Sequence, residues 1–367
     1  MGVAGAPGGM IPGHPNRSPG GAPRPDAARA GGDTASQEVA RGMQRSLARQ
    51  FYRDMVLGRR FEQAAAEQYA QGRIAGFLHL YPGEEAVAVG SLRAAAPGDY
   101  VVSTYREHVH ALVWGLSPRA VMAELFGRAT GCSGGYGGSM HLFDADRRFL
   151  GGYAIVGETF PVAVGVGYWL RMNDAPEAVL CYFGDGAANQ GTFHESLNMA
   201  ALWRLPVLFI CENNHYQIGT EIHRHTAVPE IYRHGCAYGV PGRRVDGMDV
   251  VAVYEATRMA LEHLRDGNGP YLLECETYRY RGHSMADAGA YRSALELAEL
   301  KARDPVAGFR RRALAEGWLS EEACAGIEAE VEAVVADAVA FAEQSPEPDD
   351  LRHGVYARPL DLYRGAP

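Results

Sequence analysis

An acidic residue and an amide follow two successive apolar runs of the chain, and their side chains suit the binding of a cation and a phosphate group. Asp185, in the centre of a Gly-Asp-Gly triplet, follows the run at residues 178–183, and Asn214 follows the run at 206–211. Carboxylate and amide oxygens are ligands that a hard divalent cation such as Mg²⁺ prefers, and this cation can also hold phosphate oxygens. Glycine beside the acid lets the backbone approach a diphosphate closely. The pair therefore predicts a metal–phosphate site.

A second interpretation of Asp185 needs no metal. An Asp at the end of a strand can cap the helix that follows, and here a helix would start near Ala188. Capping is the simpler explanation for an isolated Asp, but Asn214 after the next apolar run favours the metal site. Three backbone amides at the start of this helix would face the phosphate group, those of Gly184, Gly186 and Ala187.

The elements that must position these residues can be predicted from periodicity. Each apolar run is about long enough for one strand that is buried on both faces. Residues 189–204, between the runs, carry apolar side chains at helical spacing. The order strand, loop, helix, strand, loop places both polar positions at the carboxyl ends of parallel strands, where open α/β sheets bind their ligands.

Further elements are expected on both sides of this unit. We expect helices at 46–71, from about 86 to 95, at 160–171, and at 295–344 with breaks near 304–305 and 317. Short strands are expected at 100–103 and 271–276, and a glycine-rich loop at 131–138. Alternating strands and helices predict an α/β protein with a mainly parallel sheet and helices on both faces.

Composition excludes several classes of protein. The net charge of −9 argues against nucleic acid as the main partner. No apolar run reaches the roughly 18 residues of a membrane-spanning helix, so we expect no membrane span. The six cysteines are scattered without a CxxC pair, so we expect no zinc site. Residues 1–42 are rich in Gly, Ala and Pro, and we expect a disordered tail; a transit peptide is the alternative.

The Gly-Asp-Gly and Asn-Asn pattern resembles the motif of thiamin diphosphate enzymes. An ordered series of blocks over residues 45–350 resembles the alpha subunits of the pyruvate dehydrogenase first component, which are thiamin diphosphate-dependent 2-oxo acid dehydrogenases. One block alone could mislead, but the series in order is specific. The blocks are GFLHLYPGEE at 76–85, STYREHVH at 103–110, GGSMH at 137–141, GGYAIVG at 151–157, RVDGMD at 244–249 and YRYRGHS at 278–284.

The resemblance implies a fold and an assembly. It implies the thiamin diphosphate-binding fold over residues 43–290 and a helical C-terminal extension over 291–367. Enzymes of this kind use two α/β modules, and this chain has only the one that holds the diphosphate. A beta subunit is therefore implied, in an assembly of two alpha and two beta chains with thiamin diphosphate and Mg²⁺ as cofactors. The glutamate that activates the cofactor would lie on that beta subunit, so we expect this chain alone to decarboxylate poorly.

The resemblance also implies roles for individual residues. Mg²⁺ would be held by the side chains of Asp185 and Asn214 and by the backbone carbonyl of Tyr216. Two further groups of residues would contact the organic cofactor. Tyr105 and Arg106 would contact the diphosphate from the side opposite Gly184, Gly186 and Ala187, and Ala154 and Val156 would contact the aminopyrimidine ring.

Two histidines match positions near the substrate in this family, His79 and His283. Histidine titrates near neutral pH, so it could bind the substrate carboxylate or act as an acid or base. The alternative for each is a polar surface histidine. Three further histidines lie in matching blocks, and whether they touch substrate is open: His108, His110 and His141. We expect His223 and His225 to face solvent.

The implied activity is the oxidative decarboxylation of pyruvate, with transfer of the acetyl group to a lipoyl-lysine of an acyltransferase. Two other acyl donors stay as alternatives, a branched-chain 2-oxo acid and acetoin. An alternative of another class is a subunit that keeps the fold without catalysis. The expected location is a bacterial cytoplasm, with mitochondrion or plastid as the alternative.

Overall fold

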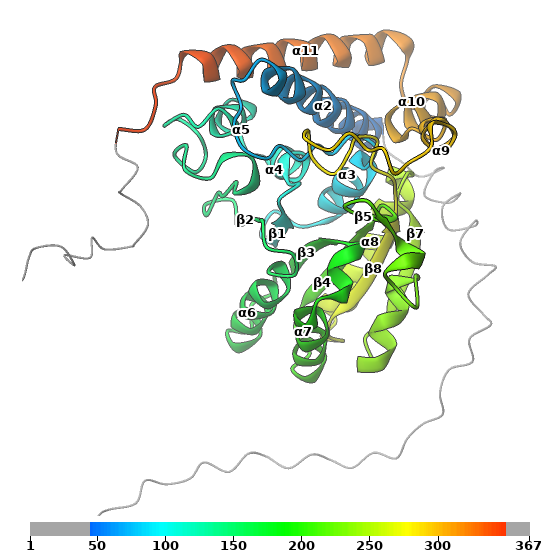
Figure 1. Cartoon of the computed structure of the whole chain (residues 1–367). Coiled ribbons are helices and arrows are strands. Elements are labelled where there is room, and N and C mark those ends of the chain that lie inside the picture. The colour runs from blue at the N-terminus through cyan, green and yellow to red at the C-terminus, as the bar shows by residue number, and fades with distance from the viewer. Residues whose placement is uncertain (1–44, 350–367) are drawn as a thin grey trace, which may run out of the picture.

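A sheet of six parallel strands forms the centre of the molecule (Figure 1). The computed structural model describes residues 45–349. In spatial order the strands are β2 (Phe149–Tyr153), β1 (Tyr100–Thr104), β3 (Val179–Gly184), β4 (Val207–Asn213), β8 (Tyr271–Glu276) and β7 (Gly242–Asp246). A separate antiparallel hairpin joins β5 (Tyr216–Gln217) and β6 (Thr220–Glu221) directly after β4.

The two central strands, β3 and β4, are buried on both faces, as their unbroken apolar runs predict. Leu180 of β3 and Leu208 of β4 belong to one hydrophobic cluster, whereas Cys181 and Phe209 belong to a second. Successive side chains of a strand point to opposite faces, so the two clusters are the cores on the two sides of the sheet. The predicted fold class, an α/β protein with helices on both faces, is confirmed.

Helices cover each core. The larger core includes side chains from α2 (Arg45–Ala70), α3 (Glu85–Ala94), α4 (His108–Trp114), α5 (Pro118–Leu125), α8 (Val250–Arg265), α10 (Pro305–Ala315) and α11 (Glu321–Gln344). The smaller core includes α6 (Thr159–Met172), α7 (Gly191–Leu202) and the 3₁₀ segment η4 (Ile231–Tyr238). The remaining short elements are η1 (Gly138–Met140), η2 (Asp185–Asn189), η3 (Ile222–Arg224) and α9 (Ala294–Lys301).

The elements predicted from periodicity are all present, with shifts of a few residues at their ends. The helix expected from residue 189 begins at Gly191, because a 3₁₀ turn, η2, precedes it. Strand β7 was not predicted, because a strand at the edge of the sheet carries polar residues such as Arg243 and Arg244 instead of an apolar run. Helix α8 was also missed, although Asp249 caps it by accepting hydrogen bonds from two backbone amides and its apolar spacing is helical.

The C-terminal helices are joined to the sheet domain by a common core. Helix α11 packs on α2 and α5 along the periphery of the molecule (Figure 1). Its buried side chains, such as Ile327 and Val331, lie in the same hydrophobic cluster as Phe51 of α2. The division at residue 290 stays a prediction. The predicted tail at 1–42 and the end of the predicted extension, 350–367, lie outside the described residues.

No helix among residues 45–349 is long and apolar enough to cross a membrane.

Candidate active site

A cavity of about 220 Å³ opens at the carboxyl edge of the sheet, where β1, β3 and β4 end. Parallel α/β sheets place their ligand sites at this edge. Every predicted site residue lines the cavity, so the structure brings together positions that lie far apart in the sequence. They are His79, Tyr105, Arg106, Ala154, Val156, Gly184, Asp185, Gly186, Ala187, Asn214, Tyr216 and His283.

Asp185 begins η2 directly after β3, and its side chain is almost fully buried. Among the described residues its Oδ2 atom has no hydrogen-bond partner, and Nε2 of His225 lies 3.4 Å from it. The capping interpretation of Asp185 is wrong, because α7 starts after Gln190 and makes no side-chain hydrogen bond at its N-terminus. A buried carboxylate that caps nothing fits a cation ligand.

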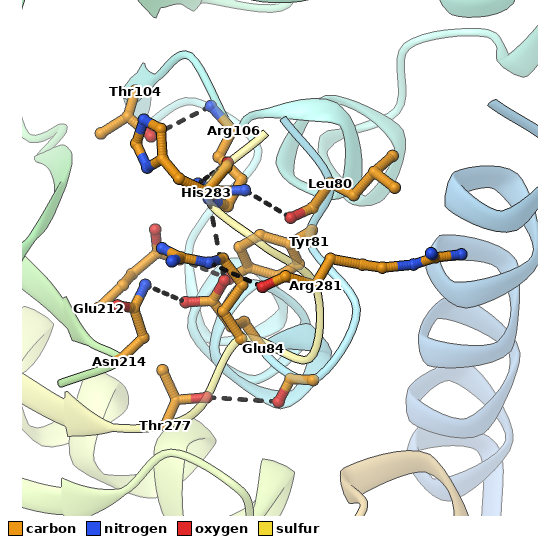
Figure 2. A network of polar contacts seen from close by, with 12 residues as sticks. Leu80, Tyr81, Glu84, Thr104, Arg106, Glu212, Asn214, Thr277, Arg281 and His283 are labelled. Atoms are coloured by element: carbon orange, nitrogen blue, oxygen red, sulfur yellow. Dashed lines mark hydrogen bonds and ion pairs between the residues drawn. The ribbon is translucent and has the colours of Figure 1, made fainter. Parts of the chain in front are cut away.

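The adjacent asparagines Asn213 and Asn214 make different contacts. Asn213 donates to the carboxylate of Glu274 at 2.6 Å and does not line the cavity. Asn214 lines the cavity; its Nδ2 donates to Glu84 at 3.1 Å, and its Oδ1 accepts from the backbone N–H of Tyr216 at 3.3 Å. These bonds fix which end of the Asn214 amide is oxygen, so Oδ1 is oriented beside the Tyr216 backbone (Figure 2 shows the bond to Glu84).

Glu84 was not among the predicted site residues, yet it lines the cavity and is fully buried. One of its oxygens accepts from Asn214. The other, Oε2, has no hydrogen bond within the described part of the chain and lies 3.9 Å from Nε of Arg106. Burial raises the pKa of Glu84 to about 7, and the positive charge of Arg106 opposes that rise. Its place in the GEE triplet before α3 was the signal available in the sequence.

Arg106 connects the strand ends to two loops. Its Nη1 atom donates to the carbonyl of Leu80 at 2.6 Å, and its Nη2 atom donates to the carbonyl of His283 at 2.9 Å (Figure 2). Each Nη group keeps a second N–H, so the guanidinium can still donate to an anion in the cavity. The neighbouring ring of Tyr105 lies with its centroid 4.5 Å from that of His79 and 5.6 Å from that of His283.

His79 and His283 meet inside the cavity, with ring centroids 5.0 Å apart. Burial lowers the pKa of His79 to about 3 and that of His283 to about 4, and the charge of Arg106 is the next cause in both. The expectation that they titrate near neutral pH is therefore wrong for the site as it stands. Both rings are neutral at pH 7, and each can donate one hydrogen bond and accept one.

A second arginine of the cavity, Arg279, was missed. Its side chain is buried, and its Nη2 donates to the Ile218 carbonyl at 3.1 Å and to the Tyr291 hydroxyl at 3.0 Å. Burial lowers its pKa, and the charge of Arg106 adds to that effect. A signal was present, since Arg279 lies in the YRYRGHS block. Two arginines beside Asp185 and Asn214 suit a diphosphate that a cation also holds.

The other histidines of the matching blocks lie outside the cavity. His108 and His110 are fully buried and pair with carboxylates, His108 with Glu62 and His110 with Glu212, each at 3.0 Å. They are therefore part of the polar interior and do not line the cavity wall. His141 is half-buried; it bonds the Gly152 carbonyl and does not line the cavity either.

The prediction that His223 and His225, which lie after β6, face solvent is right for one of the two. The side chain of His223 is 72% exposed, as expected, but that of His225 is only 9% exposed. Within residues 45–349 no group of three or more His, Cys, Asp or Glu side chains could hold a metal ion by itself. A cation in the cavity would therefore depend on amide, carbonyl and phosphate oxygens beside Asp185.

Comparison with known proteins identifies the family. The family model described as "Dehydrogenase E1 component" matches residues 53–350. The chain belongs to this family. It is 46% identical over 318 residues to the chloroplastic pyruvate dehydrogenase E1 component subunit alpha-3 of Arabidopsis thaliana, covering 84% of this chain and 74% of the relative. It is 48% identical over 299 residues to the pyruvate dehydrogenase E1 component subunit alpha of Rhizobium meliloti, covering 81% of this chain and 86% of the relative.

A third relative, the subunit of the same name from Rickettsia conorii, is 44% identical over 299 residues, covering 82% of this chain and 92% of the relative. The dehydrogenase E1 match includes every residue that lines the cavity. The family predicted from the ordered motif blocks is thus confirmed.

Proposed function

We propose that this chain is the alpha subunit of a pyruvate dehydrogenase, which decarboxylates pyruvate oxidatively with thiamin diphosphate and Mg²⁺ and passes the acetyl group to a lipoyl-lysine of an acyltransferase. The observation that carries the proposal is the cavity itself. It gathers a buried carboxylate, an oriented amide, two arginines and two neutral histidines at one edge of the sheet. The names of the relatives support the same activity.

Different residues of the cavity would bind different parts of the cofactor. Asp185, Asn214 and the Tyr216 carbonyl would hold Mg²⁺, since these three are hard oxygen donors that line one cavity. The backbone amides of Gly184, Gly186 and Ala187 would hold the diphosphate from one side, and Arg106 and Arg279 would hold it from the other. The cofactor supplies the chemistry of decarboxylation, because its thiazolium ring accepts the electrons released with carbon dioxide.

His79 and His283 would act on the substrate. As neutral rings, each offers one N–H donor to a carboxylate or to a keto oxygen that gains negative charge. Tyr105 packs against both rings and limits their rotation. Since both histidines lie beside Arg106, an anion bound at this arginine would oppose the charge that lowers their pKa values.

A partner chain is proposed because apolar side chains are exposed around the cavity. Phe77, Ile155 and Ile218 are 62%, 69% and 59% exposed. Ile155 and Ile218 line the cavity, and Phe77 precedes His79 by two residues. Exposed large apolar residues that gather at one place mark an interaction surface. We assign this surface to a beta subunit that completes the site, in an assembly of two alpha and two beta chains.

The test is an assay of the chain purified with its beta subunit, using an artificial electron acceptor and three acyl donors. Pyruvate is expected to give the highest kcat/KM, ahead of a branched-chain 2-oxo acid and acetoin. A higher kcat/KM for either of the other two donors would overturn the assignment of pyruvate as the substrate. Turnover of pyruvate at the full rate by this chain alone would overturn the two-subunit proposal, and no binding of Mg²⁺ and thiamin diphosphate by the assembly would indicate a non-catalytic subunit.

A further inference from the structure

His225 is a buried side chain beside the proposed cation ligand, and the proposed function gives it no role. It follows η3, and its backbone N–H donates to Ile222 at 3.2 Å, as does that of Thr226 at 2.9 Å. These bonds close a turn within the segment after β6. Nε2 of His225 lies 3.4 Å from Oδ2 of Asp185, and both atoms are buried with no hydrogen-bond partner among residues 45–349.

The contacts of the other ring nitrogen determine what Nε2 presents to Asp185. Nδ1 of His225 lies 3.1 Å from Nδ2 of Asn189 and 2.7 Å from Oγ1 of Thr226. The Asn189 amide is a donor, and it also donates to Thr226 Oγ1 at 3.0 Å, which leaves the Thr226 hydroxyl hydrogen for Nδ1. Nδ1 is therefore an acceptor, and in the neutral ring the single proton sits on Nε2, facing the carboxylate.

We propose that His225 is a positioning residue for Asp185: its Nε2–H holds Oδ2 of the carboxylate, so that Oδ1 is the oxygen left for a divalent cation. Asp185 reaches the cavity while His225 does not line it, which suits a residue that acts through the carboxylate. Outer hydrogen bonds of this kind orient ligating carboxylates and tune how tightly a metal is held.

His225 would orient the Asp185 side chain in the same way that Glu84 orients the Asn214 side chain. Glu84 accepts from the Asn214 amide and thereby orients Oδ1 of that side chain. His225 faces Asp185 with Nε2 3.4 Å from Oδ2, and by donating there it would select one of two equivalent oxygens. Each of these two proposed cation ligands would therefore be oriented by one buried neighbour. Glu84 accepts a hydrogen bond from Asn214, and His225 would donate one to Asp185.

The experiment uses the full chain assembled with its beta subunit, and it rests on the proposed function. Mg²⁺ is titrated by calorimetry at saturating thiamin diphosphate into the native protein and into His225→Leu and His225→Gln. Leu removes the donor, and Gln places an N–H close to the Nε2 position. His225→Leu should weaken Mg²⁺ binding by about 10-fold to 100-fold, and His225→Gln should recover most of that loss.

His223→Leu is the matched control, because His223 lies two positions earlier in the same segment and is exposed. It should leave the affinity unchanged. Thermal unfolding without cofactor separates a folding defect from a change in the site. Thr226→Val removes the hydroxyl that donates to Nδ1 of His225, and it should weaken Mg²⁺ binding less than His225→Leu does. If the native assembly binds no Mg²⁺, the proposed function fails.

Two results would overturn the inference alone. Native affinity in His225→Leu would show that Asp185 needs no orienting neighbour. A visible absorption spectrum of the Co²⁺-loaded protein that changes equally in the Leu and Gln variants would show that the imidazole binds the cation directly, because Co²⁺ spectra report nitrogen ligands. Equal spectra in the native and Gln forms support the positioning role.

Discussion

Two walls of the cavity are built in different ways. The first, the strand-end wall, consists of Arg106, Asp185 and Asn214, which follow the neighbouring strands β1, β3 and β4. The second, the loop wall, consists of His79 and His283, which lie in the loops before α3 and after β8. Backbone hydrogen bonds of the sheet fix the first wall. The second is held by two backbone hydrogen bonds between its loops, from Met285 to Leu78 and from Tyr280 to Pro82, and by side-chain contacts.

The register of the sheet explains the order of the strand-end wall. Gly184 of β3 pairs with Glu212 of β4, so Asp185, one residue on, and Asn214, two residues on, emerge at the same edge of the sheet. The loop wall has no such register. It is attached through Arg106, whose guanidinium donates to carbonyls of both loops. The comparison indicates that the strand ends set the place of the cation, and that Arg106 and the hydrogen bonds between the two loops set the place of the histidines.

The largest effect should come from the strand-end wall. Asp185→Ala removes the only carboxylate among the proposed cation ligands, so binding of Mg²⁺ and thiamin diphosphate to the assembled protein should be lost. Calorimetry measures this. Asp337→Ala, an exposed carboxylate that pairs with Arg119, is the control. Unchanged affinity in Asp185→Ala would remove the metal assignment.

Arg106→Lys tests the link between the walls. Lysine keeps the charge but lacks the planar fork, so it cannot serve both carbonyls. Loss of one such hydrogen bond, worth about 1.4 kcal/mol, should speed local opening of the loop at 277–293 about tenfold. Hydrogen exchange of the loop amides measures the rate. Arg53→Lys, at an exposed ion pair with Glu330, should not change it, and an equal rate in Arg106→Lys would mean that the loop is held by its own contacts.

The loop wall should make the protein sensitive to acid. His79 and His283 have pKa values of about 3 and 4 in the folded chain, against about 6.5 in the unfolded chain. Between these values the unfolded state binds more protons, so the free energy of unfolding falls as pH drops below about 6.5. Urea unfolding at pH 7 and pH 5 measures the loss. It should be smaller in the double variant His79→Gln, His283→Gln; an identical loss would contradict the lowered pKa values.

The smallest effect is expected at Glu84, behind the strand-end wall. Its pKa is raised from 4.5 to about 7, so the folded state holds its proton more tightly than the unfolded state does, and stability falls as pH rises from 4.5 to about 7. Glu84→Gln keeps an acceptor for Asn214 and removes that loss. Its urea midpoint should match the native value at pH 5 and exceed it slightly at pH 8. A lower midpoint at pH 8 would indicate that the charge stabilises Arg106.

Much of the strand-end wall could be predicted from sequence because local patterns encode it. Unbroken apolar runs identify β3 and β4, and polar residues at their ends must meet at one sheet edge. The loop residues His79 and His283 were found only through the motif blocks, since nothing in their local spacing places two loops together. The helices α4, α5 and α8 and the edge strands β2 and β7 were missed.

What the sequence determined by itself was the family, the α/β fold and many of the cavity residues, though not Glu84 or Arg279, because each depends on residue type and order along the chain. Tertiary structure alone decided the protonation of the histidines, the partner of Asn214 and the burial of His225. These depend on which side chains from distant segments surround a group: Arg106 beside His79, Glu84 beside Asn214, and Asp185 beside His225. Burial and neighbouring charge are properties of the folded chain, so no local pattern could contain them.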